Sequence, residues 1–139
     1  MTKGIIIIIS LIFGFTASAE MQYFHKSKHH HNAYQAVKSY PEIQLEVKKD
    51  KMDGFNLTFI TRHFTFAHQR VNQRNGLNEG HAHIYINGKK IRQYSPYFHL
   101  SGELLIKGKN EIRVSLYAND HSYFVGHKKR IQQTITIKN

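Results

Sequence analysis

Two histidines separated by one alanine, His81 and His83, have the residue type and spacing that best suit chemistry in this sequence. They lie in the stretch EGHAHIYINGKK, in which polar and apolar residues alternate as in a strand. Positions i and i+2 of a strand point to the same face, so two imidazoles can converge there on one metal ion. The apolar residues Ala82, Ile84 and Ile86 occupy the other face. We therefore expect both histidines to face water or a cleft.

A metal site needs at least one further ligand. In a sandwich, the loop before the His81 strand and the long connection at 119–130 can gather at one end, which favours His121 with its neighbour Asp120. His99, in the stretch YFHL, is the second choice. Imidazoles with a carboxylate suit Cu(II) or Zn(II), and the ligand types alone do not choose between them. The alternative is that these are hydrogen-bonding or surface residues, with NDHS forming an Asx-type turn.

Other chemistry is excluded or poorly supported. The chain has no cysteine, so it has no thiolate nucleophile, no Cys-ligated zinc site and no blue-copper site. No paired carboxylates sit at strand ends as glycoside hydrolysis requires. Asp120, His121 and Ser122 are adjacent, and adjacent residues on an extended chain cannot adopt triad geometry. We expect a protein that is not an enzyme.

The elements that must position these residues are strands. From Glu42 onward the hydrophobic period is two, and turn signals recur, including Asn87-Gly88, which predicts a type I′ hairpin. No long segment has a helical period. About seven antiparallel strands are predicted, forming an immunoglobulin-like, all-β sandwich. The expected core is Ile43, Leu45, Val47, Phe55, Leu57, Phe59, Ile84, Ile86, Ile112, Val114, Leu116, Ile135 and Ile137.

The N-terminal forty residues predict export. Residues 1–19 have the pattern typical of a secretory signal peptide: Lys3, then the apolar run IIIIISLIFGF, then the Ala-Ser-Ala site before Glu20. Residues 20–40 hold four of the eleven histidines, which predicts a flexible His-rich arm with a short helical turn near 33–37. The sandwich domain is expected at 41–139. We expect a periplasmic or extracellular protein with no transmembrane segment in the mature chain.

The charge supports a second class of function. The net charge is +11 with histidine neutral, and removal of the signal peptide takes away only Lys3. Such a charge favours anionic envelope polymers as partners, and export makes nucleic acid an unexpected one. The local clusters are KSKHHH (26–31) and HKKR (127–130). The alternative to a metal carrier is therefore a non-catalytic envelope binding or adhesion module for anionic glycan, lipid or protein.

The blocks GHAHIYINGKKI, YSPYFHL and NEIRVSLYANDHS carry a resemblance over about residues 42–137. They resemble small exported bacterial β-sandwich domains with GHxH, FHL and NDHS blocks and, more loosely, the CopC-type periplasmic copper-binding proteins. The resemblance implies a copper-binding sandwich. By motif it points to Gly80, His81, His83, His99, Asp120 and His121. It departs at the N-terminus, because CopC-type proteins use an N-terminal histidine and the predicted mature chain begins at Glu20.

Overall fold

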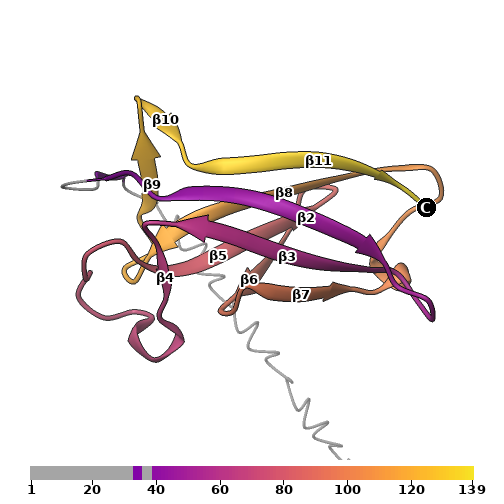
Figure 1. Cartoon of the computed structure of the whole chain (residues 1–139), viewed down its shortest axis with the longest axis horizontal. Helices are drawn as coiled ribbons and strands as arrows, with labels where there is room; N and C mark the ends of the chain where they lie inside the picture. The colour runs from indigo at the N-terminus through magenta and orange to yellow at the C-terminus, as the bar shows by residue number, and fades with distance from the viewer. Residues whose placement is uncertain (1–32, 36–38) are drawn as a thin grey trace, which may run out of the picture.

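The computed structural model describes residues 33–35 and 39–139, and within them the chain is all β (Figure 1). These residues contain eleven strands and no α-helix. They also contain two short 3-10 turns, η1 (His68–Arg70) and η2 (Gly102–Leu104). None of the described segments is a helix long and apolar enough to cross a membrane. The predicted signal peptide and most of the predicted His-rich arm lie outside the described residues.

The larger sheet is built around two central strands, β5 (Glu79–Ile86) and β8 (Lys109–Ala118), which pair antiparallel from Gly80–Ala118 to Ile86–Ile112. On either side of this pair lie shorter or peripheral strands. They are β4 (Thr65–Phe66) and β6 (Lys89–Gln93) beside β5, β9 (Tyr123–Gly126) and β11 (Gln132–Lys138) beside β8, and then β1 (Ala33–Gln35) and β10 (Lys129–Arg130) beside β9.

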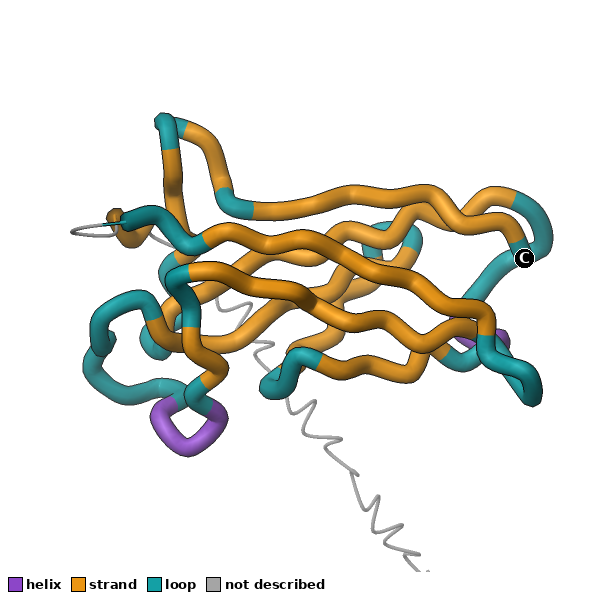
Figure 2. The backbone as a smooth tube through the Cα atoms, in the orientation of Figure 1, coloured by secondary structure: helices purple, strands orange, loops and turns teal. Residues whose placement is uncertain are grey.

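The smaller sheet has the order β2-β3-β7 and packs over the larger one (Figures 1 and 2). Its strands are β2 (Glu42–Lys49), β3 (Phe55–Arg62) and β7 (Tyr97–Leu100), all antiparallel. Along one edge the two sheets are joined where the Leu45 amide donates to Gln133 Oε1 at 2.8 Å. The predicted all-β sandwich is confirmed.

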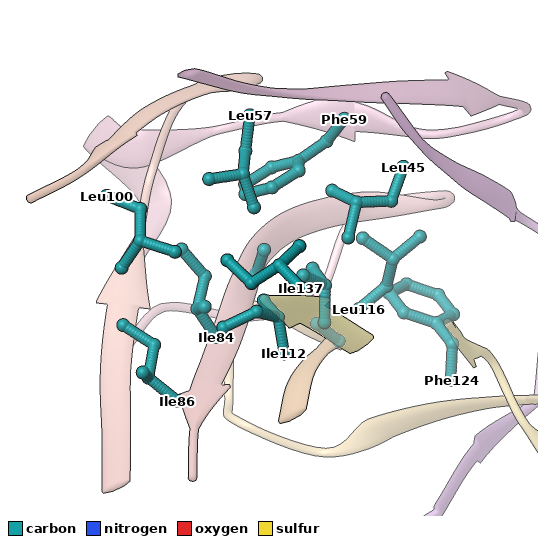
Figure 3. Packing of buried hydrophobic residues seen from close by; sticks show 13 residues of the cluster. Leu45, Leu57, Phe59, Ile84, Ile86, Leu100, Ile112, Leu116, Phe124 and Ile137 are labelled. Carbon is teal, nitrogen blue, oxygen red and sulfur yellow. The ribbon is translucent and has the colours of Figure 1, made fainter. Parts of the chain in front are cut away.

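The core lies between the two sheets (Figure 3). Leu45, Leu57 and Phe59 point down from the smaller sheet onto Ile84 and Leu116 of the larger one. Each such side chain contributes about 1.5–3 kcal/mol when fully buried. Of the expected core, Leu45, Leu57, Phe59, Ile84, Ile86, Ile112, Val114, Leu116 and Ile137 are buried, and Ile43, Val47, Phe55 and Ile135 pack against them partly buried.

The predicted Asn87-Gly88 hairpin is confirmed, since both residues have positive φ, of 49° and 84°, as a type I′ turn requires. The prediction of a helical turn near 33–37 is wrong. Ala33–Gln35 is instead a strand, which pairs parallel with Tyr123–Val125 of β9. The unpaired edge of β9 offers backbone hydrogen bonds, and local helix propensity over so few residues does not outweigh them.

Candidate metal centre

His81 and His83 are on the face of β5 that the core does not use, as the alternation predicts. They are not on the surface, however, because their exposed fractions are 0% and 1%. Of the two expected surroundings, water or a cleft, open water is therefore wrong. β5 is a central strand, flanked by β6 and β8, and aromatic rings cover its second face. The His83 ring stacks on Tyr117 at 3.8 Å between centroids, and the His81 ring lies 5.8 Å from that of Tyr94.

His121 reaches the same place from the turn between β8 and β9. That turn is closed by bonds from the His121 amide to the Ala118 carbonyl and from the Ala118 amide to the Ser122 carbonyl. His121 has φ of 67°, a left-handed conformation that histidine adopts more readily than most residues. Because Gly80 of β5 pairs with Ala118, this turn closes directly beside the strand that carries His81.

The three imidazoles converge through one atom each. His81 Nε2 is 3.0 Å from His83 Nε2 and 3.0 Å from His121 Nδ1. One ring nitrogen from each of the three residues lies within 4.8 Å of the other two. Metal–nitrogen bonds of 2.0–2.1 Å place tetrahedral ligand atoms about 3.3 Å apart, so only small side-chain shifts are needed. This buried group of three histidines could hold a metal ion, and it is the one such group among the described residues.

Asn72 determines which nitrogen His121 directs at the group. Its carbonyl oxygen Oδ1 lies 2.8 Å from His121 Nε2 and accepts a hydrogen bond from it. His121 Nε2 then carries the ring hydrogen, and Nδ1 is left with the lone pair that a metal requires. An outer hydrogen bond of this kind fixes the ring and its tautomer in many metal sites.

Several bonds join the loop that carries Asn72 to the β8–β9 turn. The Asn72 amide donates to the Asn119 carbonyl at 2.7 Å, and the Asp120 amide donates to Asn75 Oδ1 at 3.0 Å. Asn119 Nδ2 donates to Glu79 Oε1 at 2.9 Å. The long loop predicted at 67–80 is therefore tied to the turn of His121. Loops show no hydrophobic period, so no sequence pattern pointed to Asn72.

Asp120 is next to His121, but it is not part of the three-histidine group. Its Oδ1 accepts hydrogen bonds from the Ser122 amide and the Ser122 hydroxyl. Partial burial raises the pKa of Asp120, but these bonds from Ser122 outweigh it and hold the pKa below the ordinary value of 3.8. The carboxylate thus organises the turn, which is the Asx-type alternative considered for NDHS.

His99 lies in β7 of the smaller sheet, and the structure does not bring it into the group. Its Nδ1 is 3.0 Å from Asn56 Oδ1, and its Nε2 is 4.0 Å from Asp53 Oδ2. The expected approach of His99 to the end of the sandwich that holds His121 is therefore not seen. β7 pairs with β3 and is on the opposite layer from β5.

Tyr117 borders the group as a neutral phenol. Burial, followed by the hydrogen bond to the Tyr85 hydroxyl at 3.1 Å, raises the pKa of Tyr117 far above its ordinary value of 10.0. A phenolate ligand is therefore disfavoured at neutral pH. The Arg113 guanidinium lies 4.3 Å over the Tyr85 ring and completes the stack on this face of the sheet.

Comparison with protein families, curated proteins and solved structures finds no match to this chain. The function is therefore inferred from the geometry of the three histidines.

Replacing Asn72 by glycine tests its effect on His121. Glycine tolerates the φ of 64° at this position, so the change removes the side chain without adding backbone strain. We expect metal affinity to fall by about tenfold, because His121 loses the bond that fixes its tautomer. The measurement is a competition titration with a chromophoric chelator. The control is Asn75→Ala, which loosens the same pair of loops but touches no imidazole, so an equal loss in both variants would contradict this role.

Proposed function

We propose that the protein is an exported metal-binding protein, a carrier or buffer of Cu(II), or secondarily Zn(II), held by His81, His83 and His121. The observation that carries the proposal is the convergence of three imidazole nitrogens, with two separations of 3.0 Å, at a position where two of the rings are fully buried. Three imidazoles are a ligand set that both ions accept. Export is inferred from the signal-peptide pattern.

The arrangement of the rings also suits the tetragonal geometry of Cu(II). His81 lies between the other two, since its ring is 4.9 Å from His83 and 4.5 Å from His121, whereas those two rings are 5.7 Å apart. A tetragonal ion with bonds of about 2.0 Å has adjacent ligand atoms about 2.8 Å apart, and Cu(II) prefers this geometry.

A carrier or buffer fits better than a catalyst. The group contains no carboxylate that could act as a general base, and the Asp120 carboxylate is engaged by Ser122. Tyr117 remains protonated, for the reasons given above. Neutral imidazoles suit reversible binding of Cu(II), and the chain has no cysteine that could supply a thiolate.

Calorimetry of the chain from Glu20 with Cu(II) and with Zn(II) tests the proposal. We expect one tight equivalent at pH 7.5 and an affinity lower by at least about tenfold at pH 5.5. The sign follows because imidazole binds metal only when neutral and its ordinary pKa is about 6.5. A matched variant with His63, His68 and His127 replaced by alanine should bind the same equivalent. Failure to bind either metal by a folded protein would refute the proposal.

A second candidate is the envelope binding module, and the β9–β10 hairpin favours it. Lys128, Lys129 and Arg130 are all exposed there, and Arg130 lies 3.9 Å over the Tyr123 ring. Cations on a projecting hairpin are suited to binding an anionic membrane surface. Each contributes about 1 kcal/mol to the free energy of binding there.

Replacing Lys128 and Lys129 by glutamine should weaken binding to phosphatidylglycerol vesicles by about thirtyfold. The binding should also weaken as ionic strength rises from low to physiological, because exposed charges are screened. Cosedimentation measures both effects. The control is Lys89→Gln with Lys90→Gln, which removes two exposed charges from another hairpin. Equal binding by both variants would show that charge at the β9–β10 hairpin has no special role.

A further inference from the structure

A groove lies at the end of the sandwich where β2 begins, β3 ends and the β9–β10 hairpin projects (Figure 1). It consists of two adjoining hollows of about 360 and 410 Å³, since Ser39 and His63 line both. Volumes of this size are typical of sites for small molecules. None of the three histidines of the metal group is among the described residues that line it, so a ligand here binds at a second, separate site.

One wall of this groove, which we call the Tyr40 groove, is an aromatic ring held by its neighbours. The Tyr40 ring lies 5.1 Å from the His127 ring, between centroids, at an interplanar angle of 51°. It packs over Gly126, where a Cβ would be 3.1 Å from Tyr40 Cγ, so a larger residue would crowd the ring. Asn78 Nδ2 donates to the Ser39 carbonyl at 2.7 Å and holds the residue before Tyr40. The groove therefore has a flat apolar face among polar groups.

Two histidines of the groove have a strained backbone conformation. His63 has φ of 52° and His127 has φ of 49°, and Lys128, which completes the two-residue turn of the β9–β10 hairpin, has φ of 63°. Such a turn favours Asn-Gly, and strained residues of this kind cluster at ligand sites. Glycine would fit both histidine positions with less strain, so we expect the imidazoles there to have a role in binding.

The charges around the groove favour a neutral ligand. Among the described residues that line it, Glu42 has the one carboxylate, and there is no lysine or arginine. The carboxylate disfavours an anion. An organic cation is disfavoured by Arg62, which pairs with Glu42 across β2 and β3, and by Lys128, which follows His127 in the turn.

The groups that line the groove match those of a sugar. Imidazoles and a carboxylate hydrogen-bond to hydroxyl groups, and the face of an aromatic ring packs against C–H groups. A pyranose ring presents hydroxyls at its edge and C–H groups on its face. We propose that the Tyr40 groove binds a neutral saccharide through one pyranose ring. Tyr40 packs on that ring, and His63, His127 and Glu42 bond to its hydroxyls. This inference goes beyond metal binding and does not depend on it.

Nuclear magnetic resonance titration of the metal-free chain from Glu20 tests the inference. The probes are methyl glucoside, methyl galactoside and methyl mannoside, with tetrahydropyran-2-methanol as a ring that lacks the ring hydroxyls and choline as an organic cation. We expect at least one glycoside to bind with a Kd of about 1 mM, a strength usual for a ligand of this size, and to shift the ring signals of His63 and His127. Tetrahydropyran-2-methanol and choline should bind at least about tenfold more weakly.

Four variants assign the binding to the groove. Tyr40→Ala should weaken it by at least about tenfold, and Tyr40→Phe, which keeps the ring, by about twofold or less. His127→Gly relieves backbone strain, so it should keep the melting temperature while weakening binding by about fivefold. The control is Tyr97→Ala, which removes an exposed tyrosine that does not line the groove and should bind as the unchanged chain does.

Three results would overturn the inference. The first is that none of the three glycosides binds at concentrations up to about 20 mM. The second is that choline binds as tightly as the glycosides. The third is that Tyr40→Ala and His127→Gly bind as the unchanged chain does, or lose no more affinity than Tyr97→Ala.

Discussion

Replacing His81 and His83 together by glutamine is expected to abolish tight metal binding. Each of these residues directs an Nε2 atom to the centre of the group, and their backbone is fixed by pairing on both sides of β5. Loss of two of three ligands should lower affinity by at least about 1,000-fold, since even changes to outer hydrogen bonds cost 10–100-fold. Glutamine approximates the volume of histidine and avoids the cavity that alanine would leave.

Thermal unfolding with and without metal gives a second readout for this variant. A ligand at 100 times its Kd stabilises the folded state by about 2.7 kcal/mol, so Cu(II) should raise the melting temperature of the unchanged chain. It should leave that of the double variant unaltered. A control with His63 and His68 replaced by glutamine removes two imidazoles from outside the group. An equal rise in all three proteins would locate the stabilising site elsewhere.

Replacing Gly80 by alanine should damage both the fold and the site. A Cβ at this position would lie 1.9 Å from the Tyr117 carbonyl oxygen and 2.9 Å from Ala118 Cα, both of them backbone atoms of the neighbouring central strand. The clash can be relieved only by moving β5 away from β8, and with it His81. We expect a cost of about 3 kcal/mol in the free energy of unfolding. The melting temperature should fall by at least about 10 °C.

The matched change is Gly126→Ala, in β9. The three atoms nearest to a Cβ there all belong to the Tyr40 side chain, the first at 3.1 Å, and none is a backbone atom of β5 or β8. We expect this variant to lose less stability than Gly80→Ala and to keep its metal affinity. Were Gly80→Ala as stable as the unchanged chain, close contact between the backbones of β5 and β8 would not be what requires glycine before His81.

The alternation of polar and apolar residues made most of the sandwich predictable, because one face of each strand had to be apolar to form the core. The same rule misjudged the surroundings of His81 and His83. A polar face is expected to meet water, but β5 is central and Tyr117 and Tyr94 cover that face. Which strands are central depends on pairing between distant segments, and local sequence does not encode it.

The candidate site was predictable where ligands share a strand or a tight turn. The spacing of His81 and His83 determines their common face, and the turn of His121 starts at the end of a strand that pairs with theirs. His99 could not be placed, because its strand joins the other layer through β3. Asn72 was missed because loop residues carry no period. Gly80 did carry a signal, since glycine inside a strand often marks a close backbone approach.

Anomalous diffraction from crystals of the Cu(II)-loaded protein tests the central claim most directly. We expect one strong peak within about 2.0–2.1 Å of His81 Nε2, His83 Nε2 and His121 Nδ1, with the Asn72 bond to His121 Nε2 retained. A tight equivalent whose peak lies away from these three atoms, with the imidazoles still bonded among themselves and to Asn72, would contradict the account.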